Sequence, residues 1–363
     1  MGYKVPQLEP YVGREELENL KKVIDEKWIT EGPFSKEFLE IIKEFTWAKH
    51  AVLANNGTLA LFLGLLSLDI GKGDEVIVPD FTFIASGNSV AFTGAKPVFV
   101  DINEDSLNID TEKIEDAITE KTKAIMPVHI YGQSADMDPI LKLAKKYNLS
   151  IIEDAAETYG VFYKEKHTGT IGHVGIISFF ADKTVTCGEG AVVLTNDDKL
   201  YDKLRYLRNQ GRLDRGSFVH PHLGMNFRMT DLQCAIGVAQ LKKFKEIEKH
   251  KIENYRLYQS LLKDLEEISF IKKVNYSNFI PFRVNIKVKN LDKLIKYLEN
   301  NGIQTRRFFC PLHRQPCFDY LGYRENDFPV ANKVYSEGLS LPVFPGLKKE
   351  QIEYICEKIK EFY

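Results

Sequence analysis

The sequence has little of what marks several common classes of protein. It contains no run approaching roughly 18 consecutive apolar residues, so no membrane-spanning helix is expected. The first residues lack the apolar stretch of a secretory signal, which predicts a chain without one. Its 5 cysteines are scattered and form no C-x-x-C pair. This spacing argues against a disulfide framework and a zinc site, and it favours a reducing, cytoplasmic compartment.

The sequence also has almost no net charge. Its 49 lysines and arginines are balanced by 51 aspartates and glutamates, which gives a formal net charge of -2 at pH 7. Neither nucleic acid nor an anionic membrane is therefore expected as a partner. Any basic surface that binds phosphate groups must be local.

Short apolar runs that alternate with helical patterns are what the sequence does contain. Helical patterns at 58–68, 111–118 and 139–147 lie between the earlier runs. Such an alternation favours a mainly parallel sheet covered on both faces. The last two runs are joined only by a turn, so one of them is expected to be antiparallel. The seven runs that predict strands are residues 51–55, 75–80, 97–102, 123–130, 150–155, 175–180 and 191–196.

A change of pattern follows the predicted sheet. A long helical period over 230–265 leads to a strand at 279–288 and helices at 291–302 and 349–362. Together with the chain length, this pattern predicts an α/β domain followed by a smaller α+β domain. The expected division is an N-terminal segment (1–30), a large domain (31–240) and a small C-terminal domain (241–363).

Polar and aromatic residues follow several predicted strands, at the edge where open α/β sheets bind ligands. Gly57 and Thr58 open a helix after the first strand, a place suited to an anion or to a plain helix cap. Phe83 follows the second, where its ring could lie against a planar ligand or pack in the core. Asp154 ends the fifth, where a buried carboxylate needs a structural donor or a cation such as a protonated pyridine nitrogen. No G-x-G-x-x-G follows the first strand, which argues against a nicotinamide-dependent oxidoreductase.

Lys183 lies on the tight turn between the last two predicted strands. The ammonium form of a lysine is destabilised in a water-poor cleft, so its amine can act there as a nucleophile or a base. The alternative is an exposed turn lysine. The order of these signals along the strands, rather than any one of them, indicates a site.

Five segments resemble, in the same order, the DegT/StrS family of pyridoxal 5'-phosphate (PLP)-dependent nucleotide-sugar aminotransferases. They are NNGTLAL (55–61), PDFTFIASGNSV (79–90), IIEDAAETYG (151–160), SFFADKTVTCGEGAVV (178–193) and NFRMTDLQCAIGVAQL (226–241). The resemblance begins near Trp28 and covers most of the chain. It implies the aspartate-aminotransferase architecture (PLP fold type I), with a seven-stranded mixed sheet in the large domain. Ala191 departs from the G-E-G-G of the family, a mild change on a turn, and a lysine rather than a histidine at 183 favours aminotransfer over sugar dehydration.

The resemblance implies roles around the ring of PLP. Lys183 would form the covalent imine link to the cofactor. Asp154 would keep the pyridine nitrogen protonated, so that the ring can act as an electron sink. Glu157 would meet the phenolic oxygen O3′, as in the perosamine-synthase branch of the family, and Phe83 would stack on the ring.

The phosphate of PLP would be held by residues from two chains. Gly57, Thr58 and Ser178 would bind it within one chain, and Asn226 would reach the phosphate of the neighbouring subunit. This implies a homodimer with shared active sites, or a tetramer built from it. Residues 212–224, which precede Asn226, are rich in charge and histidine.

The resemblance also indicates residues on the substrate side. Trp28 in segment 28–34 and His313 in segment 305–316 would lie beside the sugar, and Arg228 would contact an anion; a structural role for His313 is the alternative. The implied activity moves an amino group from L-glutamate, which becomes 2-oxoglutarate, to a 4-keto-6-deoxy nucleotide sugar for surface polysaccharide or glycoconjugate synthesis. A 3-keto sugar, a non-sugar keto substrate and a non-catalytic ligand-sensing protein are the alternatives. No bound metal is expected.

Overall fold

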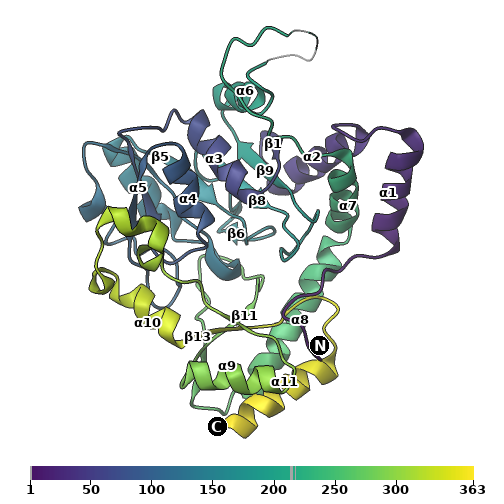
Figure 1. Cartoon of the computed structure of the whole chain (residues 1–363), viewed down its shortest axis with the longest axis vertical. Coiled ribbons are helices and arrows are strands. Elements are labelled where there is room, and N and C mark those ends of the chain that lie inside the picture. The colour runs from purple at the N-terminus through teal and green to yellow at the C-terminus, as the bar shows by residue number, and fades with distance from the viewer. Residues whose placement is uncertain (1, 213–215, 217) are drawn as a thin grey trace.

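A seven-stranded mixed sheet forms the centre of the computed structural model, which describes residues 2–212, 216 and 218–363 (Figure 1). The strand order is β1-β9-β8-β5-β4-β2-β3. Strand β9 runs antiparallel to both of its neighbours, and the pairs from β8 to β3 are parallel, as expected for two strands joined only by a turn. The strands are β1 (His50–Ala54), β2 (Glu75–Pro79), β3 (Lys96–Val100), β4 (Thr122–Ile125), β5 (Ser150–Asp154), β8 (Val174–Ser178) and β9 (Ala191–Thr195).

The fourth strand is shorter than the run that predicts it. Residues 126–130 continue the apolar run, but the chain leaves the sheet after Ile125 and turns through the 3-10 helix η2 (Ile130–Gly132). Tyr131 and Gly132 have positive φ angles of 55° and 93°. A Cβ on Gly132 would lie 1.9 Å from the carbonyl oxygen of Ile280, so only glycine fits this turn.

Helices cover both faces of the large sheet. Successive residues of β9 point to opposite faces of the sheet. Val192 packs in the core with α2 and α7, and Val193 packs in the core with α3. The predicted helix at 111–118 is only the 3-10 helix η1 (Glu115–Ala117), because the backbone is already extended at Ile118 and turns toward β4 at Thr119. The helices around the sheet are α1 (Arg14–Glu26), α2 (Pro33–Thr46), α3 (Gly57–Ser67), α4 (Ala85–Phe92), α5 (Met137–Tyr147), α6 (Asp198–Leu207) and α7 (Asp231–Lys242).

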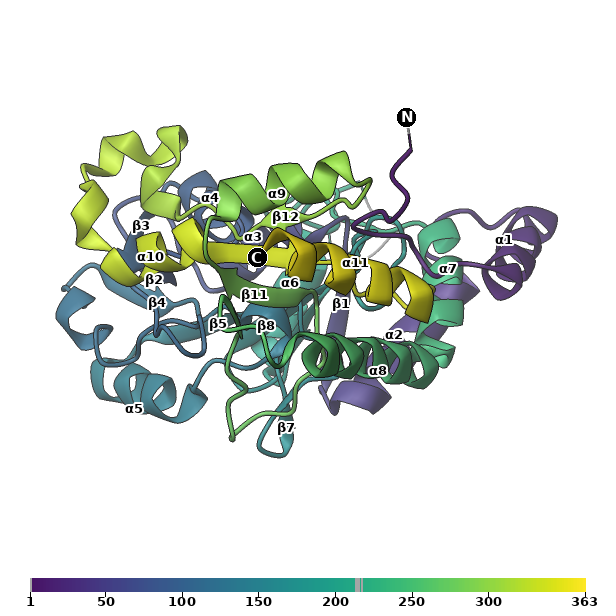
Figure 2. The same cartoon turned by 90° about the horizontal axis from the view of Figure 1, so that it is seen from below.

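A smaller antiparallel sheet, in the order β10-β11-β13-β12, lies at the other end of the chain. Its strands are β10 (Ile268–Phe270), β11 (Val284–Val288), β12 (Arg306–Arg307) and β13 (Gly338–Leu341). Helices α8 (Phe244–Leu262), α9 (Leu291–Asn300) and α11 (Lys349–Phe362) pack against it around their own hydrophobic core (Figure 2). The helical period over 230–265 is therefore two helices, α7 and α8, which meet at Lys243.

Two connections tie the smaller sheet to the rest of the chain. Val5 pairs with Ile303, so the N-terminal segment lies beside the small sheet. Between β12 and β13, the 3-10 helices η3 (Leu312–Arg314), η4 (Pro316–Leu321) and η5 (Glu325–Asp327) and helix α10 (Pro329–Glu337) turn back to the large sheet. Phe318 and Val334 of this connection belong to the large core. The division at residue 241 stays a prediction.

The carboxyl ends of β2, β4, β5 and β8 open on one edge of the large sheet, as do those of parallel strands generally. A small hairpin, β6 (Phe162–Tyr163) and β7 (Lys166–His167), follows β5. None of the helices in the described residues has the length and the apolar character that a membrane span requires.

Candidate active site

A cavity of about 830 Å³ lies at the carboxyl edge of the large sheet, a volume within the range of small-molecule sites. Residues after β1 and β2, at the ends of β5 and β8, and on or next to the strands of the small sheet line it. The cavity brings together all but one of the residues predicted to hold PLP, namely Gly57, Thr58, Phe83, Asp154, Glu157, Ser178 and Lys183.

Asp154 is the last residue of β5, and only 5% of its surface is exposed. Its carboxylate accepts hydrogen bonds from Ser86 Oγ at 2.8 Å and from the Ala156 N–H at 3.2 Å. Burial raises the pKa of Asp154, and these hydrogen bonds and Lys183 offset only part of that effect. The carboxylate therefore suits a cationic N–H donor that enters the cavity.

Glu157 and Lys183 face each other across the same cavity. Glu157 Oε1 lies 3.8 Å from Lys183 Nζ, and Glu157 Oε2 accepts a hydrogen bond from the Tyr131 N–H at 2.8 Å. Burial raises the pKa of Glu157, and the charges of Lys183 and Arg283 act against it. The Lys183 ammonium also lies 4.5 Å from the centroid of the Phe282 ring, so an aromatic face and a carboxylate direct the amine into the cavity.

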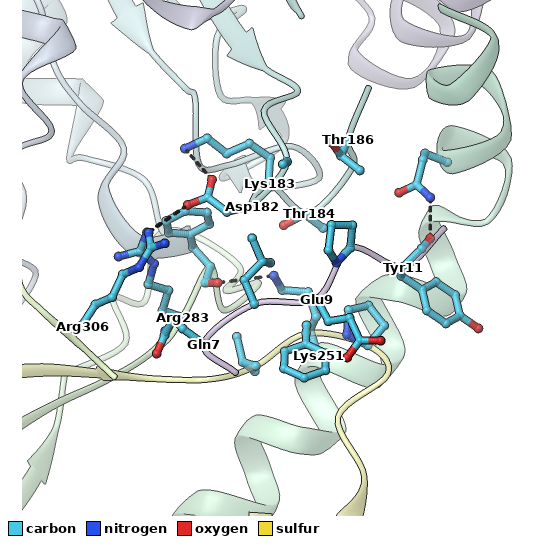
Figure 3. Close-up of a pocket in the computed structure, with 18 residues that line it drawn as sticks. Gln7, Glu9, Tyr11, Asp182, Lys183, Thr184, Thr186, Lys251, Arg283 and Arg306 are labelled. Carbon is cyan, nitrogen blue, oxygen red and sulfur yellow. Dashed lines mark hydrogen bonds and ion pairs between the residues drawn. The ribbon is translucent and has the colours of Figure 1, made fainter. Parts of the chain in front are cut away.

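Asp182 links the turn that carries Lys183 to the small sheet. Its carboxylate lies 3.8 Å from Lys183 Nζ, 3.0 Å from Arg283 Nη2 and 3.8 Å from Arg306 Nη1 (Figure 3). Burial acts to raise the pKa of Asp182, but the three cations outweigh it, and the pKa falls below the ordinary value. A second cavity of about 30 Å³, room for one or two waters, lies beside this cluster. Lys251 lines it, and burial lowers the pKa of Lys251 to about 8.

The start of α3 forms an anion cup. The first N–H groups of a helix have no partner within it, and here they belong to Gly57 and Thr58. Asn56 caps the helix by accepting a hydrogen bond from the Leu59 N–H at 3.0 Å. A Cβ on Gly57 would lie 3.2 Å from Ser178 Oγ, so glycine keeps this hydroxyl close to the helix start.

An exposed aromatic ring lines the cavity after β2. Phe83 is 56% exposed although it is a large apolar residue, and its ring lies 5.8 Å from that of Phe309. Phe81, two residues earlier, is fully buried and makes the core contacts of this segment. Phe83 therefore presents a face to which a planar ligand can stack.

Asn226 and Arg228 do not line the cavity of their own chain. Asn226 is exposed, and its Oδ1 accepts a hydrogen bond from Arg228 Nε at 2.9 Å. The Arg228 carbonyl accepts a hydrogen bond from Asn55 Nδ2 at 2.8 Å, which places the segment next to the start of α3. Of the charged and histidine-rich residues 212–224 before it, residues 213–215 and 217 lie outside the described part of the chain.

Trp28 and His313 also lie away from the cavity. Trp28 is 52% exposed, in a segment fixed by Asp231, whose carboxylate accepts hydrogen bonds from the Gly32 and Ser35 N–H groups at 2.8 and 2.7 Å. The His313 side chain is only 1% exposed, and its Nδ1 lies 2.7 Å from Asp80 Oδ2. This geometry matches the structural alternative for His313.

Several cavity and support residues were not predicted from the sequence, among them Ser86, Asp182, Arg283 and Arg306. The sequence pattern could have indicated Arg283, because it is the single charged residue in the apolar run 279–286. Arg306 lies in the segment 305–316 that the resemblance marks, next to Arg307, which pairs with Asp292. No sequence pattern indicates the roles of Ser86 and Asp182, since Asp154 and Arg283, which they contact, lie 68 and 101 positions away.

The residues around the cavity fit PLP. Asp154 offers a buried acceptor for a ring N–H, the α3 start and Ser178 offer donors for a phosphate, and Phe83 offers a stacking face. Lys183 supplies the amine between them. An α/β chain with this set of residues at the carboxyl edge of its sheet is a PLP-dependent enzyme of fold type I.

Comparisons with known proteins agree with this class. The family model of the DegT/DnrJ/EryC1/StrS aminotransferases matches residues 10–360. The GDP-perosamine synthases of Escherichia coli O157:H7 and Vibrio cholerae are each 38% identical to this chain; the alignments cover 99% of it and 98% and 99% of the relatives. The crystal structure of DesV from S. venezuelae superposes with a TM-score of 0.91 at 33% identity, covering 96% of this chain and 94% of DesV.

The chain belongs to the DegT/DnrJ/EryC1/StrS aminotransferase family. It is a PLP-dependent sugar aminotransferase, and the predicted fold type, cofactor and enzyme class are confirmed. Among the residues that the structure describes, no three histidine, cysteine or acidic side chains are grouped as a metal site.

Proposed function

We propose that this enzyme transfers the amino group of L-glutamate to a GDP-linked 4-keto-6-deoxy sugar in the synthesis of a surface polysaccharide or glycoconjugate. The observation that carries the proposal is the cavity in which Lys183, Asp154 and Glu157 meet. The similarity to GDP-perosamine synthases over nearly the whole chain supports GDP as the nucleotide and a 4-keto sugar as the acceptor.

The charges around the cavity support an acidic amino acid as the donor. Arg306 lines it with a side chain that is 47% exposed, and it lies 3.8 Å from Asp182 rather than in a tight pair. Arg283 holds Asp182 at 3.0 Å, which leaves the guanidinium of Arg306 available to a carboxylate. A planar guanidinium binds a carboxylate through two parallel hydrogen bonds, and it selects donors with such a group.

The catalytic residues divide the proton chemistry between them. When PLP is bound, its ring delocalises the charge that develops on the substrate carbon. Asp154 stabilises the protonated ring nitrogen. Lys183, freed when the donor amine replaces it, would move a proton from the donor carbon to C4′ of the cofactor, and in the second half-reaction from C4′ to the sugar carbon. Glu157, fixed by the Tyr131 N–H, sets the environment of the lysine amine.

We infer that two copies of this chain complete each site. The residues next to Asn226 expose large apolar side chains: Phe218 is 87%, Leu223 95% and Met225 47% exposed. Exposed apolar residues in such a group are typical of a protein interface. A twofold contact over this surface would bring Asn226, and Arg228 beside it, to the phosphate cup of the partner. Trp28 would then lie near the sugar across the same contact.

The direct test of the activity is amination of a panel of keto nucleotide sugars with L-glutamate, with the product identified by mass and NMR. The proposal expects the GDP-linked 4-keto-6-deoxy sugar to be the best acceptor and the new amine to be at C4. Amination at C3, or of a non-sugar keto acid alone, would replace the proposed acceptor by one of the alternatives. No amination of any acceptor by an enzyme that binds PLP would favour the ligand-sensing alternative.

Subunit mixing tests the shared site. Lys183→Ala and a variant such as Asn226→Trp are each expected to be inactive, and a mixed dimer would carry both lesions in one site and none in the other. Recovery of activity after exchange supports sharing. No recovery, with exchange verified by native mass spectrometry, would show that each chain has a self-contained site.

A further inference from the structure

Strand β5 ends in two consecutive carboxylates, and only the second one lines the cavity. Asp154 faces the cavity, whereas Glu153 points to the opposite side of the strand and is fully buried. Glu153 has no part in the site described so far. A fully buried carboxylate one residue from the group that meets the ring nitrogen calls for a physical reason.

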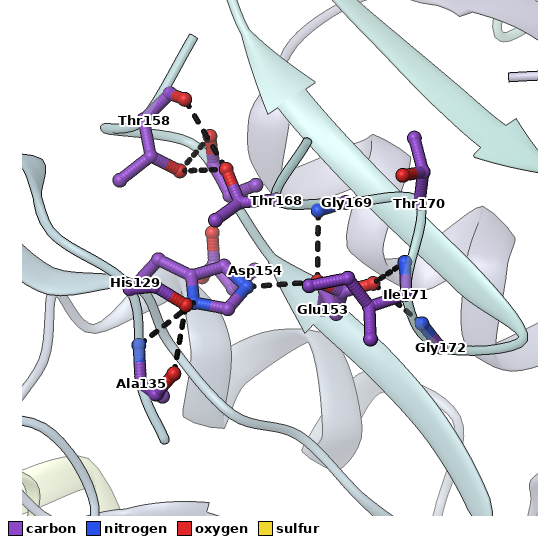
Figure 4. Close-up of polar contacts among 12 residues, drawn as sticks. His129, Ala135, Glu153, Asp154, Thr158, Thr168, Gly169, Thr170, Ile171 and Gly172 are labelled. Atoms are coloured by element: carbon purple, nitrogen blue, oxygen red, sulfur yellow. Dashed lines mark hydrogen bonds and ion pairs between the residues drawn. The ribbon is translucent and has the colours of Figure 1, made fainter. Parts of the chain in front are cut away.

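Glu153 is held by four donors (Figure 4). Its Oε2 accepts hydrogen bonds from His129 Nε2 at 2.9 Å and from the Gly169 N–H at 2.8 Å. Its Oε1 accepts hydrogen bonds from the N–H groups of Ile171 at 2.7 Å and Gly172 at 2.6 Å. Burial by itself raises the pKa of Glu153, but these hydrogen bonds reverse the effect and lower it. Glu153 is therefore an ionised carboxylate in the protein interior.

His129 is neutral in this arrangement. The Ala135 backbone N–H lies 3.0 Å from His129 Nδ1, and because an amide can only donate, Nδ1 carries no proton. The single ring proton is on Nε2, which donates a hydrogen bond to Glu153. The pair thus carries one negative charge, and both side chains are fully buried.

The pair joins two loops to the end of β5. His129 belongs to the loop after β4. Its backbone N–H donates to the Asp154 carbonyl at 3.0 Å, and the Asp154 backbone N–H donates to the Pro127 carbonyl at 2.9 Å. Two residues after His129, the Tyr131 N–H holds the Glu157 carboxylate. The other loop, residues 169–172, contributes the three backbone donors to Glu153. One buried pair therefore fixes the backbone that presents both Asp154 and Glu157.

We propose that Glu153 and His129 form a positioning pair for the cofactor site, which sets the place of the Asp154 carboxylate and, through Tyr131, that of Glu157. Glu153 acts from behind the strand and touches neither cofactor nor substrate. Its negative charge lies one residue from Asp154 and adds to the field that favours a protonated ring nitrogen. The proposal rests on the PLP site and not on the identity of the sugar.

A double-mutant cycle on PLP binding tests this role. Glu153→Gln places an amide where four N–H donors converge and leaves at least one of them unpaired, so we expect a loss of PLP affinity of about tenfold or more. The PLP affinities of Glu153→Gln, Asp154→Asn and the double variant are measured by titrating apo protein. If Glu153 acts through Asp154, the loss in the double variant is smaller than the product of the two single losses. A loss equal to that product contradicts the proposal.

A matched control variant separates positioning from general stability. Thr168→Val changes an equally buried side chain in the neighbouring segment. The Thr168 hydroxyl donates to Thr158 Oγ1 and to the Val161 carbonyl and does not contact Glu153. The substitution is expected to lower the melting temperature and to leave PLP affinity unchanged. An equal loss of affinity in Thr168→Val would show that any damage to this region has the same effect.

His129 provides the second route if Glu153→Gln does not fold. His129→Gln keeps an N–H donor near the place of Nε2, whereas His129→Leu removes it. PLP affinity and the visible absorption spectrum of the bound cofactor should be close to wild type in the Gln variant and altered in the Leu variant. Equal values in the two variants would overturn the role of this hydrogen bond.

Discussion

Replacing Asp154 by asparagine separates the electrostatic role of this residue from its structural one. The amide has the shape of the carboxylate: its oxygen can accept the hydrogen bond from the Ala156 N–H, and its NH₂ can donate to Ser86 Oγ. Ser86 can then direct its own proton to Thr82 Oγ1, 3.1 Å away. The fold should therefore tolerate the change. What is lost is the charge-assisted hydrogen bond to the cofactor ring.

The magnitude follows from the burial of Asp154. A hydrogen bond to a charged group contributes about 1.5–3 kcal/mol, so PLP affinity should fall about ten- to 150-fold. Turnover should fall further, by about 10²- to 10³-fold, because the amide cannot stabilise the positive ring nitrogen while charge develops. PLP affinity is measured by titrating apo protein, and turnover by following each half-reaction in stopped flow.

The same substitution is not expected to lower the folding stability of the apo protein at neutral pH, although it weakens PLP binding. Burial raises the pKa of Asp154, so the folded apo protein binds this proton more tightly than the unfolded chain does. The contribution of Asp154 to stability therefore falls as pH rises from the unfolded pKa, about 4, through the folded pKa. Apo Asp154→Asn should be at least as stable as apo wild type at neutral pH and should lose that advantage in acid. Near-normal PLP affinity and turnover in the variant would refute the assignment and leave Asp154 as a structural residue.

Three further substitutions test other parts of the cavity. Lys183→Ala should still bind PLP through the anion cup but should show no steady-state turnover; normal turnover would remove Lys183 from the mechanism. Phe83→Ala should weaken PLP binding by about 1 kcal/mol or more with little change in melting temperature, since the side chain is 56% exposed; an unchanged PLP affinity would mean that the ring does not stack. Arg306→Gln should raise the KM for L-glutamate more than it lowers kcat, and an effect on kcat alone would place the donor carboxylate elsewhere.

The cavity could be predicted from the sequence to the extent that it depends on strand ends. Asp154 ends an apolar strand and Lys183 lies between two of them, so the topology of a parallel sheet brings both to one edge. Gly57 was found for the same reason, because a helix starts directly after β1. These positions follow from local patterns and a general rule of chain topology.

Contacts between distant segments could not be predicted in the same way. Arg283 reaches Asp182 over 101 positions of the chain, and the Tyr131 N–H that holds Glu157 is a backbone group that any residue carries. The residue type and the segment of His313 suggest a sugar contact, but its ring is buried against Asp80, which lies 233 positions away in the sequence. The role proposed for Asn226 involves a second copy of the chain, and no pattern within one sequence specifies such a contact.

A single-turnover transfer of nitrogen tests the central claim most directly, namely that this chain moves an amino group from an amino acid to a keto sugar. PLP-loaded enzyme is treated with L-glutamate labelled with nitrogen-15, freed of excess donor, and mixed with the GDP-linked 4-keto-6-deoxy sugar. The account predicts that the visible absorption of the cofactor is lost with glutamate and restored by the sugar, and that the label appears in the sugar product. A cofactor band that does not respond to glutamate, or a sugar product without the label, would contradict it.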